Sequence, residues 1–200
     1  MTPLRAADAI WAVFAIVWLV TSFGRKPAQR RENPLARLSH MLFMAAAFLL
    51  LSSRGHAFGP LGRRFLPETS WVPTLGVAIT AAGVAFAIWA RVHLGKQWSG
   101  DVTIRQDHEL IRSGPYAHIR HPIYTGILAA MFGTALIAGE VRGLAAVVIA
   151  TIGFWRKARK EESFLAQEFG PRFEEHKKHT GFFLPRFSAP PSPPGRSADR

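Results

Sequence analysis

Stretches without any charged side chain dominate the pattern of polar and apolar positions along the chain. Four long ones cover residues 9–24, 38–53, 69–90 and 121–139, and a shorter one covers 143–155. A helix needs roughly 20 mostly apolar residues to cross a bilayer, and flanking or interfacial side chains complete a shorter stretch. The pattern therefore predicts an all-α integral membrane protein with about five transmembrane helices, the last two forming a C-terminal helical hairpin.

A soluble bundle of buried helices is the main alternative. Only 19% of the residues are charged and 48% are hydrophobic, which leaves too little polar surface to cover a soluble core.

The first uncharged stretch, residues 9–24, also resembles the apolar region of a signal peptide, but no Ala-x-Ala cleavage site follows it. We therefore expect this stretch to be retained as the first helix.

Turn residues and charged segments set the boundaries of the expected elements. We expect helices over about residues 7–23, 35–53, 70–93, 122–139, 143–157, 156–168 and 172–178. The chain then divides into three parts. Residues 1–93 hold the first three transmembrane helices, residues 94–187 hold a polar loop, the hairpin and an amphipathic helix, and the Pro-rich tail 188–200 is expected to be disordered.

Lys and Arg are unevenly distributed among the segments that connect these helices. If residues 25–37 face the cytoplasm, 20 of the 25 Lys and Arg residues lie on the cytoplasmic side, as the positive-inside rule requires. This places the N-terminus outside, and the loop before the hairpin and the C-terminus in the cytoplasm. Topology and contact with anionic headgroups thereby explain the net charge of +12, and we expect no nucleic acid partner.

Several common kinds of site are excluded by residue type or spacing. The chain has no cysteine, which removes disulfides, thiolate metal sites and cysteine nucleophiles. His108, His118 and His121 lack the i, i+4 spacing of a zinc-binding helix and have no carboxylate cluster, so we expect no metal. The segment 95–100 is not a Gly-x-Gly-x-x-Gly fingerprint, which argues against a Rossmann cofactor site.

The cytoplasmic loop before the hairpin carries the chain's most unusual side chains. The protein has only two tyrosines, Tyr116 and Tyr124, and both lie in or beside this loop. Pro122 suits the first turn of the following helix, and the N-terminus of that helix, reinforced by Arg120, attracts carboxylates or phosphates. Interfacial anchoring explains Trp98 as well as a binding role does, but it explains the two tyrosines less well.

Lys157 and Glu161 lie four residues apart in the charged segment after the hairpin. As i, i+4 neighbours they can form a solvated salt bridge of small energy, or they can place a carboxylate beside a cationic or hydroxyl-bearing ligand. Charge alone favours the salt bridge.

Three blocks of sequence are specific enough to indicate a family. They read His-x-Leu-Ile-x-Ser-Gly-Pro-Tyr at 108–116, Arg-His-Pro-x-Tyr-x-Gly at 120–126 and Glu-Glu-x-x-Leu-x-x-x-Phe-Gly at 161–170. The second block alone is shared in similar form by sterol reductases. Combined at this distance, the blocks resemble the isoprenylcysteine carboxyl methyltransferase family, which belongs with the integral-membrane phospholipid methyltransferases.

The resemblance implies a methyltransferase core at 94–187 that binds S-adenosylmethionine in a cytoplasm-facing pocket of the C-terminal helices and loops. The cofactor-binding residues that it implies are His108, Glu109, Leu110, Ile111, Tyr116, His121, Pro122, Ile123, Tyr124 and Glu161. Lys157 stands where the family has a substrate-contacting arginine. With Arg120 and Glu161 it forms the candidate catalytic set.

The chain departs from the family pattern after residue 170. Phe173, His176 and His179 stand in place of a Tyr-x-x-Tyr-x-x-Arg element, and Lys157 offers a point charge in place of a bidentate guanidinium. These departures put the prenylcysteine carboxylate in doubt as the acceptor. None of the substituted positions lies in the predicted cofactor-binding segments 108–116 and 121–124.

The expected function is methyl transfer to a lipid-like or hydrophobic acceptor at the membrane. A carboxylate acceptor needs only orientation, by Lys157 or Arg120. An amine must first lose a proton, which Glu161, Glu162 or a histidine can accept. Methylation on oxygen, nitrogen or sulfur stays open, as does the oligomeric state.

Two other functions stay open. The first is an NADPH-dependent membrane reductase of the sterol reductase type. Those enzymes carry an Arg-Asp-Glu type motif where this chain has Lys160, Glu161 and Glu162, and usually an asparagine where it has Ile123. The second is a non-catalytic membrane protein that retains the fold.

Overall fold

Long helices make up most of the chain that the structure, a computed structural model, describes. The described residues are 1–22, 28–30, 33–52, 56–67, 71–95, 104–105 and 110–187. Their elements are α1 (Pro3–Val20), β1 (Ala28–Arg30), α2 (Pro34–Ser52), the 3-10 helix η1 (His56–Gly62), α3 (Trp71–Leu94), β2 (Ile104–Arg105), the 3-10 helix η3 (Gly114–Ala117), α4 (Pro122–Ala138), α5 (Val141–Phe169) and α6 (Pro171–His179).

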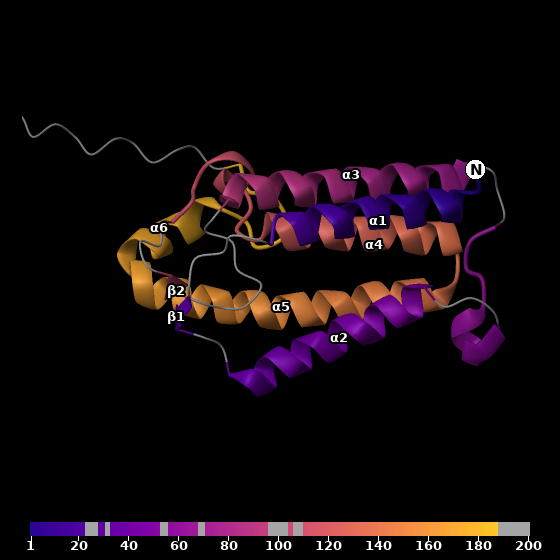
Figure 1. Ribbon diagram of the computed structural model, residues 1–200, viewed down its shortest axis with the longest axis horizontal. Helices are drawn as coiled ribbons and strands as arrows, with labels where there is room; N and C mark the ends of the chain where they lie inside the picture. Colours follow the sequence, from indigo (N-terminus) through magenta and orange to yellow (C-terminus); the bar gives the residue numbers. More distant parts are fainter. Residues whose placement is uncertain are drawn as a thin grey trace, which may run out of the picture.

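The helices are arranged in two layers (Figure 1). One layer contains α1, α3 and α4, and the other contains α2 and α5. The α4–α5 hairpin joins the layers, and a shared apolar core that includes Ala87, Met131 and Phe154 lies between them. The amphipathic end of α5 and the short helix α6 extend beyond one end of this bundle.

Glycines allow α3 and α4 to pack at very short distance. Gly76 and Gly83 of α3 face Gly133 and Gly126 of α4, and a Cβ at Gly83 would lie only 2.5 Å from the main-chain nitrogen of Ala130. Small residues at such a spacing are typical of helix pairs in membranes, where close backbone approach drives association. The start of α4 is therefore positioned by its contact with α3.

The α4–α5 turn is short and is fixed at its outer end. Gly139 ends α4 in the left-handed region with a φ of 64°, which glycine adopts without strain. The 63–65 segment pairs with this turn, because Phe65 N donates to Gly139 O at 2.9 Å and Val141 N donates to Arg63 O at 3.0 Å. The hairpin therefore runs antiparallel from a defined turn.

Three helices, α1, α2 and α3, are long and apolar enough to cross a membrane, and α4 is a shorter apolar helix. The 29 residues of α5 make a helix about 43 Å long, which exceeds the roughly 30 Å hydrocarbon core of a bilayer. Its charged C-terminal part therefore extends beyond the apolar part of the bundle.

The helical architecture agrees with the sequence prediction, with one difference. The helix expected at 143–157 continues into the charged helix expected at 156–168, and the two together form α5. The strands β1 and β2 form a short antiparallel pair that an all-α prediction omits, in which backbone groups of the two segments bond to each other. The predicted tail at 188–200 lies outside the described residues.

Candidate active site

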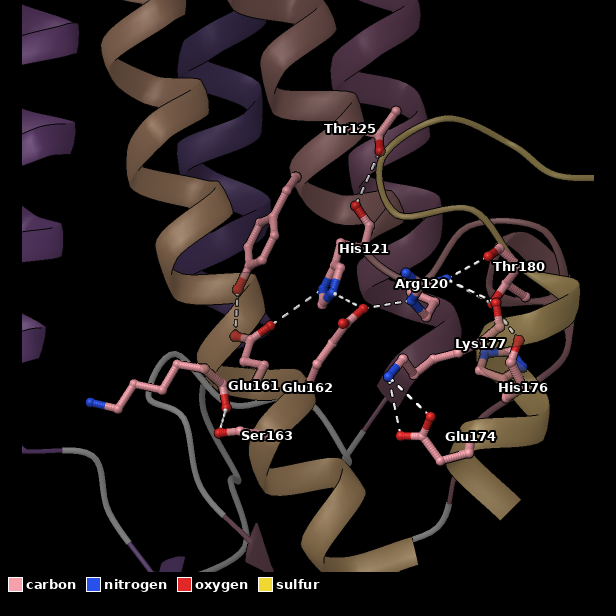
Figure 2. Close-up of polar contacts among 12 residues, drawn as sticks. Arg120, His121, Thr125, Glu161, Glu162, Ser163, Glu174, His176, Lys177 and Thr180 are labelled. Atoms are coloured by element: carbon pink, nitrogen blue, oxygen red, sulfur yellow. Dashed lines mark hydrogen bonds and ion pairs between the residues drawn. The ribbon is translucent and has the colours of Figure 1, made fainter. Parts of the chain in front are cut away.

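The start of α4 and the C-terminal half of α5 bring together most of the polar side chains that the sequence singled out (Figure 2). Arg120 and His121 directly precede α4, and Tyr124 lies in its first turn. Glu161 and Glu162 lie on α5. Because the two helices run antiparallel from a short turn, the beginning of α4 lies beside this part of α5.

A continuous set of hydrogen bonds and ion pairs links these five side chains (Figure 2). The Tyr124 hydroxyl donates to Glu161 Oε1 at 2.5 Å. The His121 ring lies between the two carboxylates, with Nδ1 3.5 Å from Glu161 Oε2 and Nε2 3.3 Å from Glu162 Oε1. Arg120 Nε donates to Glu162 Oε1 at 2.5 Å. We call these five residues the Glu161 network.

Burial and neighbouring charges act in opposite directions on the pKa values of the Glu161 network. Burial lowers the pKa of His121, but the hydrogen bonds and charges of Glu161 and Glu162 outweigh it and raise the pKa above 6.5. Burial raises the pKa of both glutamates, but the hydrogen bond from His121 and the nearby cations Lys157 and Arg120 lower it below 4.5. The network therefore holds two ionised carboxylates around a readily protonated imidazole.

Stacked aromatic rings continue the network toward the core of the bundle. The His121 ring stacks on Tyr124 with centroids 5.7 Å apart, and Tyr124 stacks on Phe154 of α5 at 4.6 Å. Phe154 in turn contacts the ring of His40 of α2 at 5.6 Å. Lys157 Nζ lies 5.8 Å from the centre of the Tyr124 ring. The ring of Tyr124 is thus held from both sides, with a cation nearby.

A segment after α6, which we call the C-terminal strap (residues 180–187), is tied to the residues before α4. Arg120 N donates to Gly181 O at 2.9 Å, and His121 N donates to Phe182 O at 3.3 Å. The guanidinium of Arg120 also donates to the main-chain oxygen of Thr180. The strap therefore fixes the backbone from which two residues of the Glu161 network project.

Three other residues predicted to bind the cofactor are buried near the network: Tyr116, Pro122 and Ile123. Tyr116 is buried, and its hydroxyl donates to the main-chain oxygen of Ala90 of α3 at 3.4 Å; burial and the charge of Glu161 raise its pKa. Pro122 and Ile123 are buried at the start of α4. In this structure Tyr116 therefore contacts α3 directly, and its hydroxyl makes no hydrogen bond to the described members of the Glu161 network.

The predicted cofactor turn at 108–111 is described only in part. Leu110 and Ile111 are half-buried, and Ile111 packs against the apolar core. His108 and Glu109 lie outside the described residues.

The three residues that depart from the family pattern after residue 170 lie on α6. Phe173 is almost completely buried, with 1% of its surface exposed. His176 is also buried, and burial together with the charges of Arg112 and Arg120 lowers its pKa to about 4. His179 Nε2 lies 2.9 Å from Glu175 Oε1 on the same helix. Phe173 and His176 therefore serve the packing of α6.

Two side chains near the site were absent from the predicted cofactor-binding and catalytic residues. Glu162, which the sequence offered only as one of several proton acceptors for an amine, joins Arg120 to His121. His40 was passed over because it lies in an apolar stretch defined by the absence of Asp, Glu, Lys and Arg. Its Nδ1 is buried without a hydrogen-bond partner in the described structure.

Known proteins resemble this chain over part of their length. A cobalt-zinc-cadmium resistance protein of Cupriavidus metallidurans is 31% identical over 122 residues, which cover 60% of this chain and 54% of that protein. The protein-S-isoprenylcysteine O-methyltransferase B of Arabidopsis thaliana is 26% identical over 114 residues, which cover 56% of this chain and 58% of that protein. The chain thus spans little more than half the length of these relatives.

A solved structure shares the fold. It is that of the eukaryotic intramembrane Ras methyltransferase, isoprenylcysteine carboxyl methyltransferase, with a TM-score of 0.56 and 20% sequence identity over 80% of this chain and 56% of that one. The family model described as phospholipid methyltransferase matches residues 71–172. That match covers more than half of the chain and contains α3, the hairpin and the whole Glu161 network. The chain therefore belongs to the phospholipid methyltransferase family.

Proposed function

We propose that this protein is an S-adenosylmethionine-dependent methyltransferase that acts on a hydrophobic, lipid-like acceptor at the membrane surface. The Glu161 network is the observation that carries the proposal. It places ionised carboxylates, an aromatic ring and a helix N-terminus together at the end of an apolar bundle. The family to which the chain belongs supports the same chemistry.

The proposed arrangement in the membrane has five spans. The three long apolar helices, the shorter α4 and the apolar part of α5 cross the bilayer. The distribution of Lys and Arg puts the N-terminus outside and the C-terminus inside. The Glu161 network then faces the cytoplasm, from which a water-soluble cofactor arrives, while an apolar acceptor reaches the same place from the lipid.

The side chains of the site suit the charges of S-adenosylmethionine. Its sulfonium and ammonium groups are cations, which a carboxylate and an aromatic face both attract. The side chain of Glu161 is 22% exposed and Tyr124 is half-buried beside it. The cofactor's own carboxylate suits the first turn of α4, where the N–H groups of Ile123 and Tyr124 have no partner within the helix.

Positioning and exclusion of water are the contributions expected of the protein in such a reaction. When bound, S-adenosylmethionine would supply a methyl group to the acceptor atom, and its sulfur would leave in line as a neutral thioether. Glu161 binds the cationic part of the cofactor, and the hydroxyl of Tyr124 orients the carboxylate of Glu161. The Arg120–Glu162 pair holds His121 in place. The stacked rings of Tyr124 and Phe154 exclude water on the side of the bundle core.

We favour a carboxylate acceptor over an amine. A carboxylate is nucleophilic without losing a proton, and Lys157 lies one helical turn before Glu161 to orient it. An amine needs a base, and the low pKa of Glu161 makes its carboxylate a weak one. The relatives named isoprenylcysteine O-methyltransferases are consistent with an oxygen acceptor.

Calorimetric titration of the detergent-purified protein with S-adenosylmethionine, and separately with NADPH, tests the proposal. The variants are Glu161→Gln and, as a matched control, Glu168→Gln, which changes an exposed carboxylate on the same helix. We expect the wild type and the control to bind S-adenosylmethionine equally and Glu161→Gln to bind it at least tenfold more weakly. A hydrogen bond to a charged group contributes about 1.5–3 kcal/mol.

Two outcomes would contradict the proposal. One is that the folded wild type binds no S-adenosylmethionine. The other is that it binds NADPH instead, which would favour the reductase alternative. Incubation of the protein with membrane lipids and S-adenosylmethionine that carries a deuterated methyl group, followed by mass spectrometry, then identifies the acceptor.

A further inference from the structure

We propose that the tip of the C-terminal strap inserts into the cytoplasm-facing edge of the bilayer, and that the membrane thereby holds the strap against the start of α4. Leu184 and Phe187 form this tip. Each is 78% exposed, and large apolar side chains that lie together at a surface mark contact with a membrane or a partner. The proposal goes beyond methyl transfer and rests on the arrangement of the helices in the membrane that is proposed above.

The strap lies over the side of α4 that points away from the bundle. Thr125 Oγ1 donates to Phe183 O at 2.7 Å, and Figure 2 shows the strap passing beside Thr125. Thr125 shares a helix face with Ala129 and Phe132, which follow four and seven residues later. Phe132 is 42% exposed, whereas its neighbour Met131 is completely buried. The strap therefore continues the outward, lipid-facing surface of α4 at the cytoplasmic end of that helix.

The length of α4 places the tip at the depth of the bilayer edge. The helix has 17 residues and is about 26 Å long, which is less than the roughly 30 Å hydrocarbon core of a bilayer. When α4 crosses the bilayer, its first turn therefore lies within the apolar layer or at its edge. The bond between Thr125 and Phe183 holds the strap at the level of that turn. Leu184 follows directly, at the depth where interfacial segments bury apolar side chains.

A cationic side chain lies between the two apolar residues of the tip. Arg186 is exposed, and its Nη1 donates to the main-chain oxygen of Lys178 on α6 at 3.0 Å. At a membrane surface, long cationic side chains keep their charge in water while neighbouring apolar side chains lie deeper. The order Leu-Pro-Arg-Phe at 184–187 therefore suits an amphipathic anchor.

The strap is a tight turn and not a loose end. A Cβ at Gly181 would lie only 1.8 Å from the main-chain oxygen of Leu184, so the turn requires glycine. Gly181 N and Arg186 N both donate to the main-chain oxygen of His118, at 2.9 and 3.0 Å. The turn is thus closed on one carbonyl group, and the exposed tip projects from a fixed base.

The same turn holds part of the Glu161 network. The N–H groups of Arg120 and His121 donate to strap carbonyl groups, and the ring of Phe182 lies 4.9 Å from the ring of His121. If the strap moved away, both N–H groups would lose their partners and Leu184 would pass into water. Removing apolar surface from water is favourable, so burial of the tip in the membrane edge favours the closed strap.

Spin labelling of the protein in nanodiscs of dioleoylphosphatidylcholine tests the insertion. The chain has no cysteine, so one introduced cysteine carries the label at a defined place. Electron paramagnetic resonance compares collisions of the label with oxygen, which concentrates in lipid, and with a water-soluble nickel chelate. The variant is Leu184→Cys. Its controls are Phe132→Cys on the lipid-facing side of α4 and Glu168→Cys at an exposed position of the charged part of α5.

We expect the ratio of oxygen to nickel collisions for Leu184→Cys to be at least threefold higher than for Glu168→Cys and close to that for Phe132→Cys. A ratio for Leu184→Cys no higher than that for Glu168→Cys would overturn the insertion. A low ratio for Phe132→Cys would overturn the arrangement of α4 on which the insertion rests.

Hydrogen exchange in the same nanodiscs tests whether the membrane holds the strap. The variant is Leu184→Ser, and Leu184→Met is the matched control because it keeps an apolar side chain at the tip. Circular dichroism shows that both are folded. We expect the N–H groups of Arg120 and His121 to exchange at least threefold faster in Leu184→Ser than in the wild type or Leu184→Met. Equal exchange in all three would overturn the hold on the strap. Neither measurement uses S-adenosylmethionine, so both decide the proposal even if the methyltransferase assignment fails.

Discussion

Replacing Gly83 with alanine tests whether the close contact between α3 and α4 stabilises the bundle. A Cβ at this position would lie 2.5 Å from the main-chain nitrogen of Ala130 and 2.6 Å from the main-chain oxygen of Gly126. Both neighbours belong to the backbone of α4, so no side-chain rotation relieves the contact. The two helices must separate by about 1 Å to restore ordinary van der Waals distances.

The expected cost follows from two opposing effects. Overpacking of a tight interface destabilises a protein by about 1–3 kcal/mol, and a clash with backbone atoms belongs at the upper end of that range. Alanine recovers up to about 1 kcal/mol through its better helix propensity. The net destabilisation is therefore about 1–2 kcal/mol, which for a protein of this size lowers the unfolding temperature by about 2–8 °C.

Thermal unfolding in detergent micelles, followed by circular dichroism, measures this effect. Gly62→Ala is the control, because a Cβ there meets nothing within 4 Å. Adding Ala130→Gly to Gly83→Ala should not restore stability, since the clash involves the nitrogen of residue 130 and not its Cβ. If Gly83→Ala unfolds at or above the wild-type temperature, the inferred packing is wrong.

Three further predictions concern the Glu161 network. Arg120→Ala removes the guanidinium partner of buried Glu162, leaves only His121 beside it, and should destabilise the protein by about 3–5 kcal/mol in thermal unfolding; Arg120→Lys should restore only part of this because it lacks the guanidinium fork. Tyr124→Phe removes the hydroxyl that orients Glu161 and should weaken S-adenosylmethionine binding about tenfold in calorimetry, and unchanged affinity would argue against this role. The raised pKa of His121 stabilises the fold below pH 6.5, and this contribution is lost as the pH rises through the folded-state value. The lowered pKa of Glu161 stabilises it above pH 4.5 and is lost as the pH falls through its folded-state value. The unfolding temperature should thus be highest at a pH between the folded-state pKa values of Glu161 and His121 and should decline at lower and at higher pH. His121→Gln should remove the decline at higher pH.

The sequence predicted those features that depend on neighbours along the chain. Uncharged stretches located the long apolar helices, and Pro122 marked the start of α4. The juxtaposition of Tyr124 with Glu161 was also predictable, because a short turn between two apolar stretches brings the start of one helix beside the later part of the next. The family resemblance pointed to the same pair.

The features that the sequence did not predict depend on packing between distant segments. His40 contacts Phe154 only because α2 crosses α5 at Gly153, where a Cβ would lie 2.9 Å from the Cβ of Phe43. Nothing local to His40 indicates that crossing point. The C-terminal strap is similar, since its pairing with Arg120 and His121 joins segments that are about 60 residues apart.

The unbroken backbone of α5 has a consequence for regulation by the host membrane. The apolar part of this one helix packs against α2 and its charged part carries Glu161, whereas Tyr124 belongs to the shorter α4; in the proposed arrangement only the apolar part lies in the bilayer. Longer or shorter lipid tails shift or tilt spanning helices to different extents. The proposed methyl transfer is thereby expected to depend on acyl-chain length, so that its rate would differ between membranes of different thickness.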